Sequence, residues 1–307
     1  MSISGLRRWP LIGGIVAILL LAGFAVFYLT RHSGTTPADF ARYFPAREAT
    51  VFYIDIGAIR ASGLLDKLVG STVGEDPEYR KFIEQTGFDY KRDLNQVMLN
   101  SAGGIHYFVL QGRFDWQKLE SYAANQSGTC RDGYCYMKGS TPDRVISWRR
   151  IRRDMMALAS ARDEAGARAI DRRSDDPVTF QIPKASLWLY LPSEALHSAS
   201  QLPAGTRMIA KALEPAQRAV FSLAANEDHF QLVMDVVCGS QEEAAIMKAQ
   251  LESITKLLTS LIRRETKKPN PDDLSGVLTS GSFSRSETHV IGNWTIRRAF
   301  LLSLGSS

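Results

Sequence analysis

The sequence predicts an α+β protein in which an N-terminal transmembrane helix is followed by two similar halves, each an antiparallel sheet with helices on one face. Three observations support this prediction. Residues Leu11–Leu29 form a run of 19 residues without a charge. The rest of the chain alternates strand-like segments, rich in β-branched and aromatic residues, with amphipathic helical segments. The order of these segments is similar before and after residue 176.

The uncharged run Leu11–Leu29 is long enough to cross a bilayer as a helix, because 19 residues span roughly 28 Å. Arg7 and Arg8 precede it and no acid occurs before Asp39, so the N-terminus is expected in the cytoplasm. The alternative is a cleaved signal peptide, but the run is longer than such cores and ends in bulky residues. We therefore expect a single-pass protein of the inner (cytoplasmic) membrane, bound to the lipid bilayer through this helix, with a periplasmic or extracellular C-terminal domain.

Composition and turn signals divide the chain into four segments. These are a cytoplasmic tail with the anchor (1–32), a short linker (33–40), a first α+β half (41–176) and a second α+β half (177–307). The boundary between the halves falls at Ser174-Asp-Asp-Pro177. Residues after 32 carry 34 basic and 32 acidic side chains, so the pI of 9.1 owes much to the flanks of the anchor and predicts no nucleic-acid partner.

Cys130 and Cys135 flank Asp132-Gly133, a dipeptide typical of a two-residue type I′ hairpin turn. In such a hairpin the two cysteines face each other at a non-hydrogen-bonded pair, where Cα atoms lie about 4.5 Å apart. That separation suits a disulfide, which needs the oxidising compartment that the exported topology provides. The alternatives are two free thiols or a metal site. Cys238 is expected to be a buried apolar residue.

Periodicity and capping residues predict the remaining elements. Strands are expected at 49–56, 105–110, 144–148, 155–160, 185–191, 218–225 and 230–237, with two more within 283–296. Helices are expected at 58–68, 77–86, 115–125, 163–172, 204–213, 240–264 and 272–280, and a loop at 100–104. The two segments beginning at Trp148 and Trp294 are similar to each other, which also suggests an internal repeat.

The helix that begins after Ser240 is the longest one expected after the anchor. Ser240 and Glu243 form a capping box. An apolar stripe then follows at alternating spacings of four and three: Met247, Leu251, Ile254, Leu258 and Leu261. Packing on the helix's own sheet is favoured over an intermolecular coiled coil, because the stripe covers only about three heptads.

The layout resembles a loose class of uncharacterised bacterial single-pass envelope proteins. The matching segments are Ala49–Asp55, the strand that follows the anchor, and Phe230–Ile262, where a strand, a small turn and a long helix follow one another. This resemblance implies an extracytoplasmic α+β domain with two halves. It concerns layout alone and implies no catalytic or binding residue.

The sequence lacks the common catalytic and phosphate-binding motifs. It has no His-Glu-x-x-His, no Cys-x-x-Cys, no Gly-x-Ser-x-Gly and no glycine-rich phosphate loop. His106 and Asp55 lie in or beside apolar strands, where a carboxylate could orient an imidazole, but two satisfied structural residues are the favoured interpretation. We therefore expect no cofactor, no metal and no catalytic residue.

The segment from Arg144 to Arg173 contains nine arginines. Within it Arg149, Arg150, Arg152 and Arg153 are candidates for contact with anionic groups or with a membrane surface. The alternative is a solvated surface on which nearby acids serve as partners.

These observations favour a non-enzymatic, membrane-anchored extracytoplasmic protein, a binding or scaffold component of the cell envelope that associates with another envelope protein. The alternative is a membrane-tethered hydrolase or transferase with an unrecognised site. A pocket that gathers His106 or His289 with a carboxylate would favour that alternative.

Overall fold

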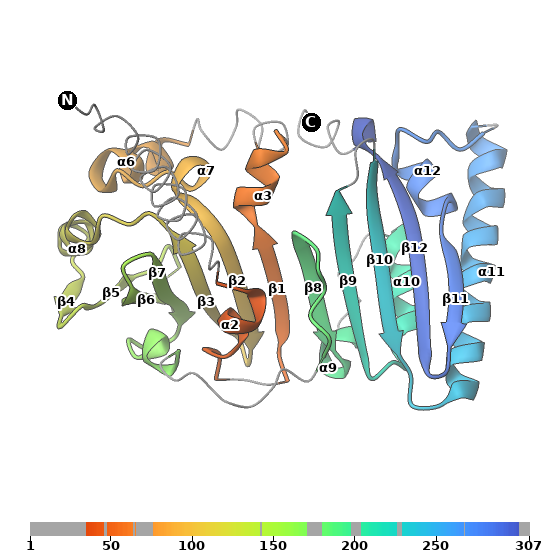
Figure 1. The fold of residues 1–307 in the computed structure, drawn as a ribbon, viewed down its shortest axis with the longest axis horizontal. Helices are drawn as coiled ribbons and strands as arrows, with labels where there is room; N and C mark the ends of the chain where they lie inside the picture. The colour runs from red at the N-terminus through yellow and green to blue at the C-terminus, as the bar shows by residue number, and fades with distance from the viewer. Residues whose placement is uncertain are drawn as a thin grey trace, which may run out of the picture.

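The computed structural model describes residues 35–45, 48–63, 65, 76–141, 143–170, 180–197, 204–225, 229–266 and 268–300. This part of the chain is an α+β fold built on one antiparallel sheet of 12 strands, which confirms the predicted class (Figure 1). The strand order is β11-β12-β10-β9-β8-β1-β2-β3-β7-β6-β5-β4. The strands are β1 (Thr50–Asp55), β2 (Leu94–Ala102), β3 (Ile105–Gly112), β4 (Thr129–Arg131), β5 (Tyr134–Lys138), β6 (Val145–Arg152), β7 (Met155–Ala161), β8 (Leu187–Pro192), β9 (Arg218–Ala225), β10 (His229–Val237), β11 (Ser282–Ser286) and β12 (His289–Arg297).

The helices are α2 (Pro37–Ala41), α3 (Ile56–Ala61), α6 (Pro77–Thr86), α7 (Tyr90–Asp93), α8 (Trp116–Asn125), η1 (a 3-10 helix, Gly166–Ala169), α9 (Ser193–Leu196), α10 (Ala204–Leu213), α11 (Gln241–Thr266) and α12 (Leu274–Thr279). Helices α6, α8, α10, α11 and α12 begin and end within two residues of the predicted bounds, whereas α2, α7 and α9 were not predicted. Helix α6 begins at Pro77 after the N-cap Asp76 and ends at Gly87, whose φ of 70° suits glycine. Helix α11 begins with the expected bond from the Glu243 amide to the Ser240 hydroxyl (3.1 Å).

The predicted anchor, Leu11–Leu29, and the predicted boundary between residues 176 and 177 lie outside the described residues. Within the described ranges, no helix has both the length and the apolar character needed to cross a membrane.

The sheet has two flanks that meet where β1 pairs with β8, with Tyr53 opposite Trp188. The first flank, β1 to β7, runs outward as β1-β2-β3-β7-β6-β5-β4, and the second flank, β8 to β12, runs outward as β8-β9-β10-β12-β11. On both flanks a third strand (β3 or β10) leads into a longer helix (α8 or α11), and later strands extend the sheet beyond it, four on the first flank and two on the second. The β4–β5 hairpin has no counterpart between α11 and β11 in the described part of the second flank.

Helices cover the two flanks differently. On the first flank, α2 and η1 pack on one face of the sheet through Phe40 and Ile170, whereas α6 and α8 pack on the other face through Phe82 and Leu119. On the second flank, α10 and α11 build a core on a single face, the same side as α6 and α8. In Figure 1, α2 lies in front of the sheet, whereas α10 lies behind it. The expectation of helices on one face therefore describes the second flank better than the first.

The sequence analysis missed one central strand. Residues 100–102, expected in a loop, belong to β2, and only Gly103 and Gly104, both with positive φ, make the turn to β3. The strand was missed because Asn95, Gln96 and Asn100 have low strand propensity. Residues 94–102 nevertheless form a strand because β1 and β3 pair with them on both sides, and this long-range pairing overrides the local preference. The helix expected at 163–172 is only the short η1 in the described residues.

Candidate anion-binding groove

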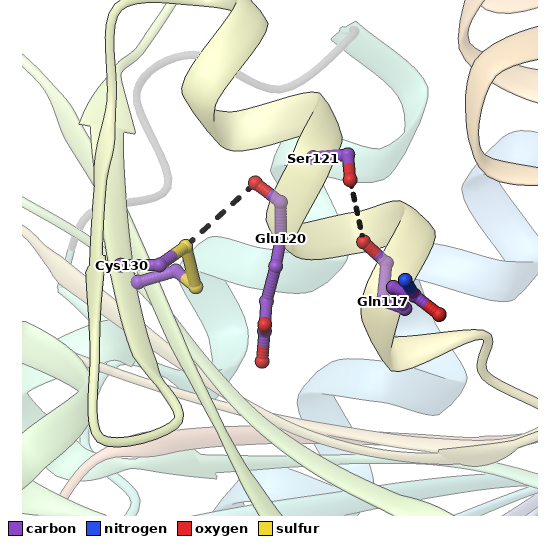
Figure 2. Close-up of a disulfide and its surroundings, with 5 residues drawn as sticks. Gln117, Glu120, Ser121 and Cys130 are labelled. Carbon is purple, nitrogen blue, oxygen red and sulfur yellow. Dashed lines mark hydrogen bonds between the residues drawn. A yellow bond between two sulfur atoms is a disulfide. The ribbon is translucent and has the colours of Figure 1, made fainter.

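The cysteine hairpin has the predicted geometry. Asp132 and Gly133 have φ values of 52° and 74°, as a type I′ turn requires. Cys130 pairs with Cys135, and the disulfide joins Cα atoms 4.1 Å apart. Figure 2 shows the bond beside α8, where the Cys130 Sγ lies 3.9 Å from the Glu120 carbonyl oxygen. A disulfide sulfur carries no hydrogen, so this is a packing contact that seats the hairpin on the helix.

The third cysteine is also placed as expected. Cys238 is buried beside Met247 of α11, with 3.8 Å between the two sulfur atoms. Burial, and to a lesser extent the charge of Glu243, raises the pKa of its thiol. Cys238 is therefore a small apolar core residue that stays protonated at neutral pH.

A hollow of about 1010 Å³ opens on the first flank, where four segments distant in sequence meet. These are the end of α6 and its following loop, the α7–β2 junction, the β3–α8 connection and the β6–β7 turn. The lining residues are Thr86, Gly87, Phe88, Arg92, Asp93, Gly112, Arg113, Phe114, Asp115, Trp116, Lys118, Arg153 and Asp154.

A second hollow of about 460 Å³ adjoins the first at Trp116, which lines both. Its other walls come from α8, the disulfide hairpin and β6. The lining residues are Trp116, Glu120, Asp132, Gly133, Tyr134, Cys135, Trp148, Arg149 and Arg150. We call the two hollows together the Trp116 groove.

Aromatic rings form a continuous floor along the first hollow. Phe88 and Phe114 are stacked with centroids 5.3 Å apart, and Phe114 contacts Trp116 at 5.2 Å. Phe82 packs edge-on against Phe88 at 6.3 Å and ties this floor to α6. Such pairs stabilise a fixed arrangement beyond the area that they bury. The groove therefore presents a rigid, partly apolar surface.

A buried carboxylate holds two cations at the rim of the first hollow. Asp93 is 5% exposed and lies 2.8 Å from both Arg92 and Arg113. Burial opposes its ionisation, but the hydrogen bonds from Arg92 and the Asp89 amide, with the charges of both arginines, outweigh burial and lower the pKa of Asp93. One carboxylate between two guanidiniums leaves an excess positive charge at this end of the hollow.

Arg150 and Arg153 flank Trp116. The Trp116 Nε1 donates to the Arg153 carbonyl (3.0 Å), and the Arg150 guanidinium lies 6.0 Å from the centroid of the indole ring. Arg153 lines the first hollow and Arg150 the second. Both side chains are exposed, and among the described residues neither forms an ion pair with a carboxylate. Each hollow thus has one arginine available to a ligand.

The other two predicted arginines point elsewhere. Arg149 also lines the second hollow, but its half-buried guanidinium donates to the Ile170 carbonyl (2.8 Å) on the opposite face of the sheet. Arg152 donates to the Thr35 hydroxyl (2.6 Å) and lies 3.6 Å from Asp154. A β-bulge between Arg150 and Arg152 interrupts the regular alternation of side chains along β6, so these two arginines point in different directions. The four arginines therefore do not form one surface. Of these four, only Arg150 and Arg153 border the groove with an exposed side chain, and both lie beside Trp116 of α8.

Of the two histidines considered as partners of a carboxylate, only His289 contacts one, and His106 and Asp55 have separate structural partners. His106 accepts from or donates to the Ser101 hydroxyl (2.9 Å), whereas Asp55 caps α3 at the opposite end of β1. His289 Nδ1 lies 2.8 Å from Asp235, and both side chains are 40% exposed. Neither His106 nor His289 lines the Trp116 groove. Among the described residues, no group of three or more His, Cys, Asp or Glu side chains is placed to hold a metal ion.

Sequence reasoning missed Trp116 and its neighbours, although a local signal exists. The segment Arg113-Phe-Asp-Trp-Gln-Lys118 places two aromatic residues and two cations around a helix N-terminus. Apolar residues at such a start are expected to enter a core, but Trp116 is only half-buried and borders two hollows. Aromatic residues beside cations near an Asp N-cap were the available clue.

No family model and no curated protein matches this chain. Among solved structures, crystal forms I, III and IV of TP0453 are similar to it, at 10%, 11% and 11% sequence identity and TM-scores of 0.48, 0.46 and 0.44. The matches cover 88–89% of this chain and 96–100% of the TP0453 chains. Because these TM-scores lie below 0.5, the function proposed below is argued from the residues of this chain alone.

Proposed function

We propose that this protein is a non-enzymatic binding component of the cell envelope: a single-pass anchor at Leu11–Leu29 holds an extracytoplasmic domain of two similar halves, and the Trp116 groove binds an anionic ligand. The observation that carries the binding role is the pair of exposed arginines, Arg150 and Arg153, one in each hollow beside a shared indole. Guanidinium groups form strong bidentate contacts with carboxylates and phosphates, so anions are the ligands this arrangement favours.

Two independent features support the extracytoplasmic location. The uncharged run has the length of a membrane span and carries arginines before it. The Cys130–Cys135 disulfide is a bond that persists in oxidising compartments. The exported topology accounts for both features.

The location can be tested by counting thiols on the full-length protein extracted from membranes without reductant. Maleimide labelling under denaturing conditions should modify only Cys238, and prior reduction should add Cys130 and Cys135. Three labels without reduction would contradict an oxidising compartment. Labelling of the native protein should be low because Cys238 is buried.

The binding role can be tested with polyphosphate and the full chain in neutral detergent. Replacement of both arginines, Arg150→Ser with Arg153→Ser, should weaken binding about a hundredfold or more, since each charge-assisted contact contributes about 1.5–3 kcal/mol. The matched control is Arg263→Ser with Arg285→Ser, two exposed arginines of the second flank. Equal losses in both double variants would indicate general attraction by net charge and would count against the groove.

A further inference from the structure

We propose that the ligand of the Trp116 groove is an acidic oligosaccharide that crosses the indole of Trp116 and places one acidic group in each hollow. This inference rests on the proposed anion-binding function and specifies its substrate class.

The first step is that the two hollows form one site. Trp116 lines both hollows, and each hollow is also lined by one of the two exposed arginines, Arg150 and Arg153. Arg150 and Arg153 are linked to the same indole, one by its position over the ring and the other by its carbonyl at Nε1. An elongated ligand that contacts both arginines therefore has to pass Trp116.

The second step concerns the acids that alternate with the arginines. Glu120 and Asp132 line the second hollow, and Asp115 and Asp154 line the first. These carboxylates would repel a continuously anionic chain or surface. They would instead accept hydrogen bonds from hydroxyl groups, which are donors. A ligand that suits this pattern has spaced acidic groups separated by neutral, hydroxyl-rich units.

The third step is the aromatic floor. Trp116 and Phe114 are half-buried, in contact with each other, and line the first hollow. A sugar ring presents an aliphatic C–H face that packs on aromatic rings, while its hydroxyls stay available at its edge. Polyphosphate has no aliphatic face. A membrane lipid presents its polar headgroup to the protein, while its apolar chains lie away from it. An acidic oligosaccharide is the class that matches the indole, the guanidiniums and the carboxylates together.

The experiment compares four probes on the full chain in neutral detergent or nanodiscs. They are hyaluronan oligosaccharides, in which glucuronate alternates with a neutral amino sugar; dextran oligosaccharides of equal length; polyphosphate; and vesicles containing phosphatidylglycerol. We expect hyaluronan to bind at least tenfold more tightly than dextran or polyphosphate. The variants Arg150→Ser and Arg153→Ser should each weaken hyaluronan binding about tenfold.

Trp116→Ala separates the saccharide proposal from the more general one. It should weaken hyaluronan binding about tenfold and change polyphosphate binding less than twofold, and Trp116→Phe should restore most of the hyaluronan affinity. Polyphosphate or vesicle binding that equals hyaluronan binding, with no effect of Trp116→Ala, would overturn the saccharide class and leave anion binding in place. Failure of every anionic probe would overturn both. Should Trp116→Ala not fold, the comparison of hyaluronan with dextran and polyphosphate on the wild-type protein still decides the saccharide class, and the arginine variants, whose side chains are exposed, test the groove as the binding site.

Discussion

The two flanks of the sheet use the same face in opposite ways. One row of paired residues crosses that face from edge to edge: Ser282, Asn293, Val233, Ser222, Trp188, Tyr53, Met98, Val109, Ala157, Arg149, Tyr134 and Arg131. From Trp188 to Ala157 the row is apolar and buried, and Tyr53, Met98 and Val109 are at most 2% exposed. Beyond Trp188 on the second flank the row is mostly polar, and its side chains are half-buried or exposed.

The difference follows from what covers the row. Helix α2 and η1, with Phe180, close the face over the first flank. In the described residues no helix packs on that face of the second flank, whose helices build their core on the other side. Because uncovered sheet faces meet water, serine, asparagine and glutamine replace the apolar residues there. Similar orders of elements can therefore carry different surfaces, and the first flank alone has the Trp116 groove.

The largest effect is expected at Trp188, where the row passes from one flank to the other. Its buried ring is stacked on Tyr53 at 5.5 Å and contacts Phe180 at 5.6 Å. Trp188→Ala should lower the free energy of unfolding by about 3–5 kcal/mol in urea titrations. We expect a single transition in the wild type and the variant, because the residue packs on both sides of the β1–β8 pair.

Trp188→Phe is the control for this variant. The Trp188 Nε1 is buried and has no hydrogen-bond partner in the described residues, so phenylalanine should cost much less than alanine. Two separate transitions, with only one of them shifted by Trp188→Ala, would show that the flanks unfold independently.

The next-largest effect is expected for two valines that hold equivalent positions on the two flanks. Val109 on β3 and Val233 on β10 are both the third strand residue outward from the β1–β8 pair in the same row. Val109→Ala should cost about 2 kcal/mol, because two buried methyl groups are lost and a cavity remains. Val233→Ala should cost less than about 1 kcal/mol, since the side chain already meets solvent. Equal costs would mean that the second flank is covered by a part of the chain or a partner.

A third effect concerns the buried carboxylate of the first flank. The pKa of Asp93 is lowered in the folded state, so its ionised form stabilises the fold at pH values above its unfolded pKa of about 3.9. This contribution is lost as the pH falls through the lowered folded-state pKa. Asp93→Asn should cost about 1–2 kcal/mol at pH 7 and should flatten the acid limb of the stability curve. An acid limb as steep as that of the wild type would assign the pH dependence to other carboxylates.

Local chemistry made much of this fold predictable, whereas the groove depends on distant segments. Asp132-Gly133 determines its turn, and Asp76 and Gly87 delimit α6, because these residues act on neighbouring backbone. No local sequence pattern predicts that β1 pairs with β8. Nor does one predict that residues 86–93, 112–118 and 153–154 come together around the hollow beside Trp116. The similarity between Trp148 and Trp294 also misled, since they lie on β6 and β12, which hold different places in the sheet order.

The smallest effect is expected at the histidine–carboxylate contact of the open face, which is an ion pair only when the imidazole is protonated. Asp235 and His289 lie 2.8 Å apart on the second flank, and each is 40% exposed, in contrast to buried Asp93. Exposed pairs contribute about 0–1 kcal/mol, because water and salt screen them. His289→Ala should therefore change the free energy of unfolding by less than about 1 kcal/mol, and under conditions acidic enough to protonate the imidazole 0.5 M salt should remove most of the difference. A loss of 2 kcal/mol or more, insensitive to salt, would mean that the pair is shielded from water, and the open face would then be a covered surface like its counterpart on the first flank.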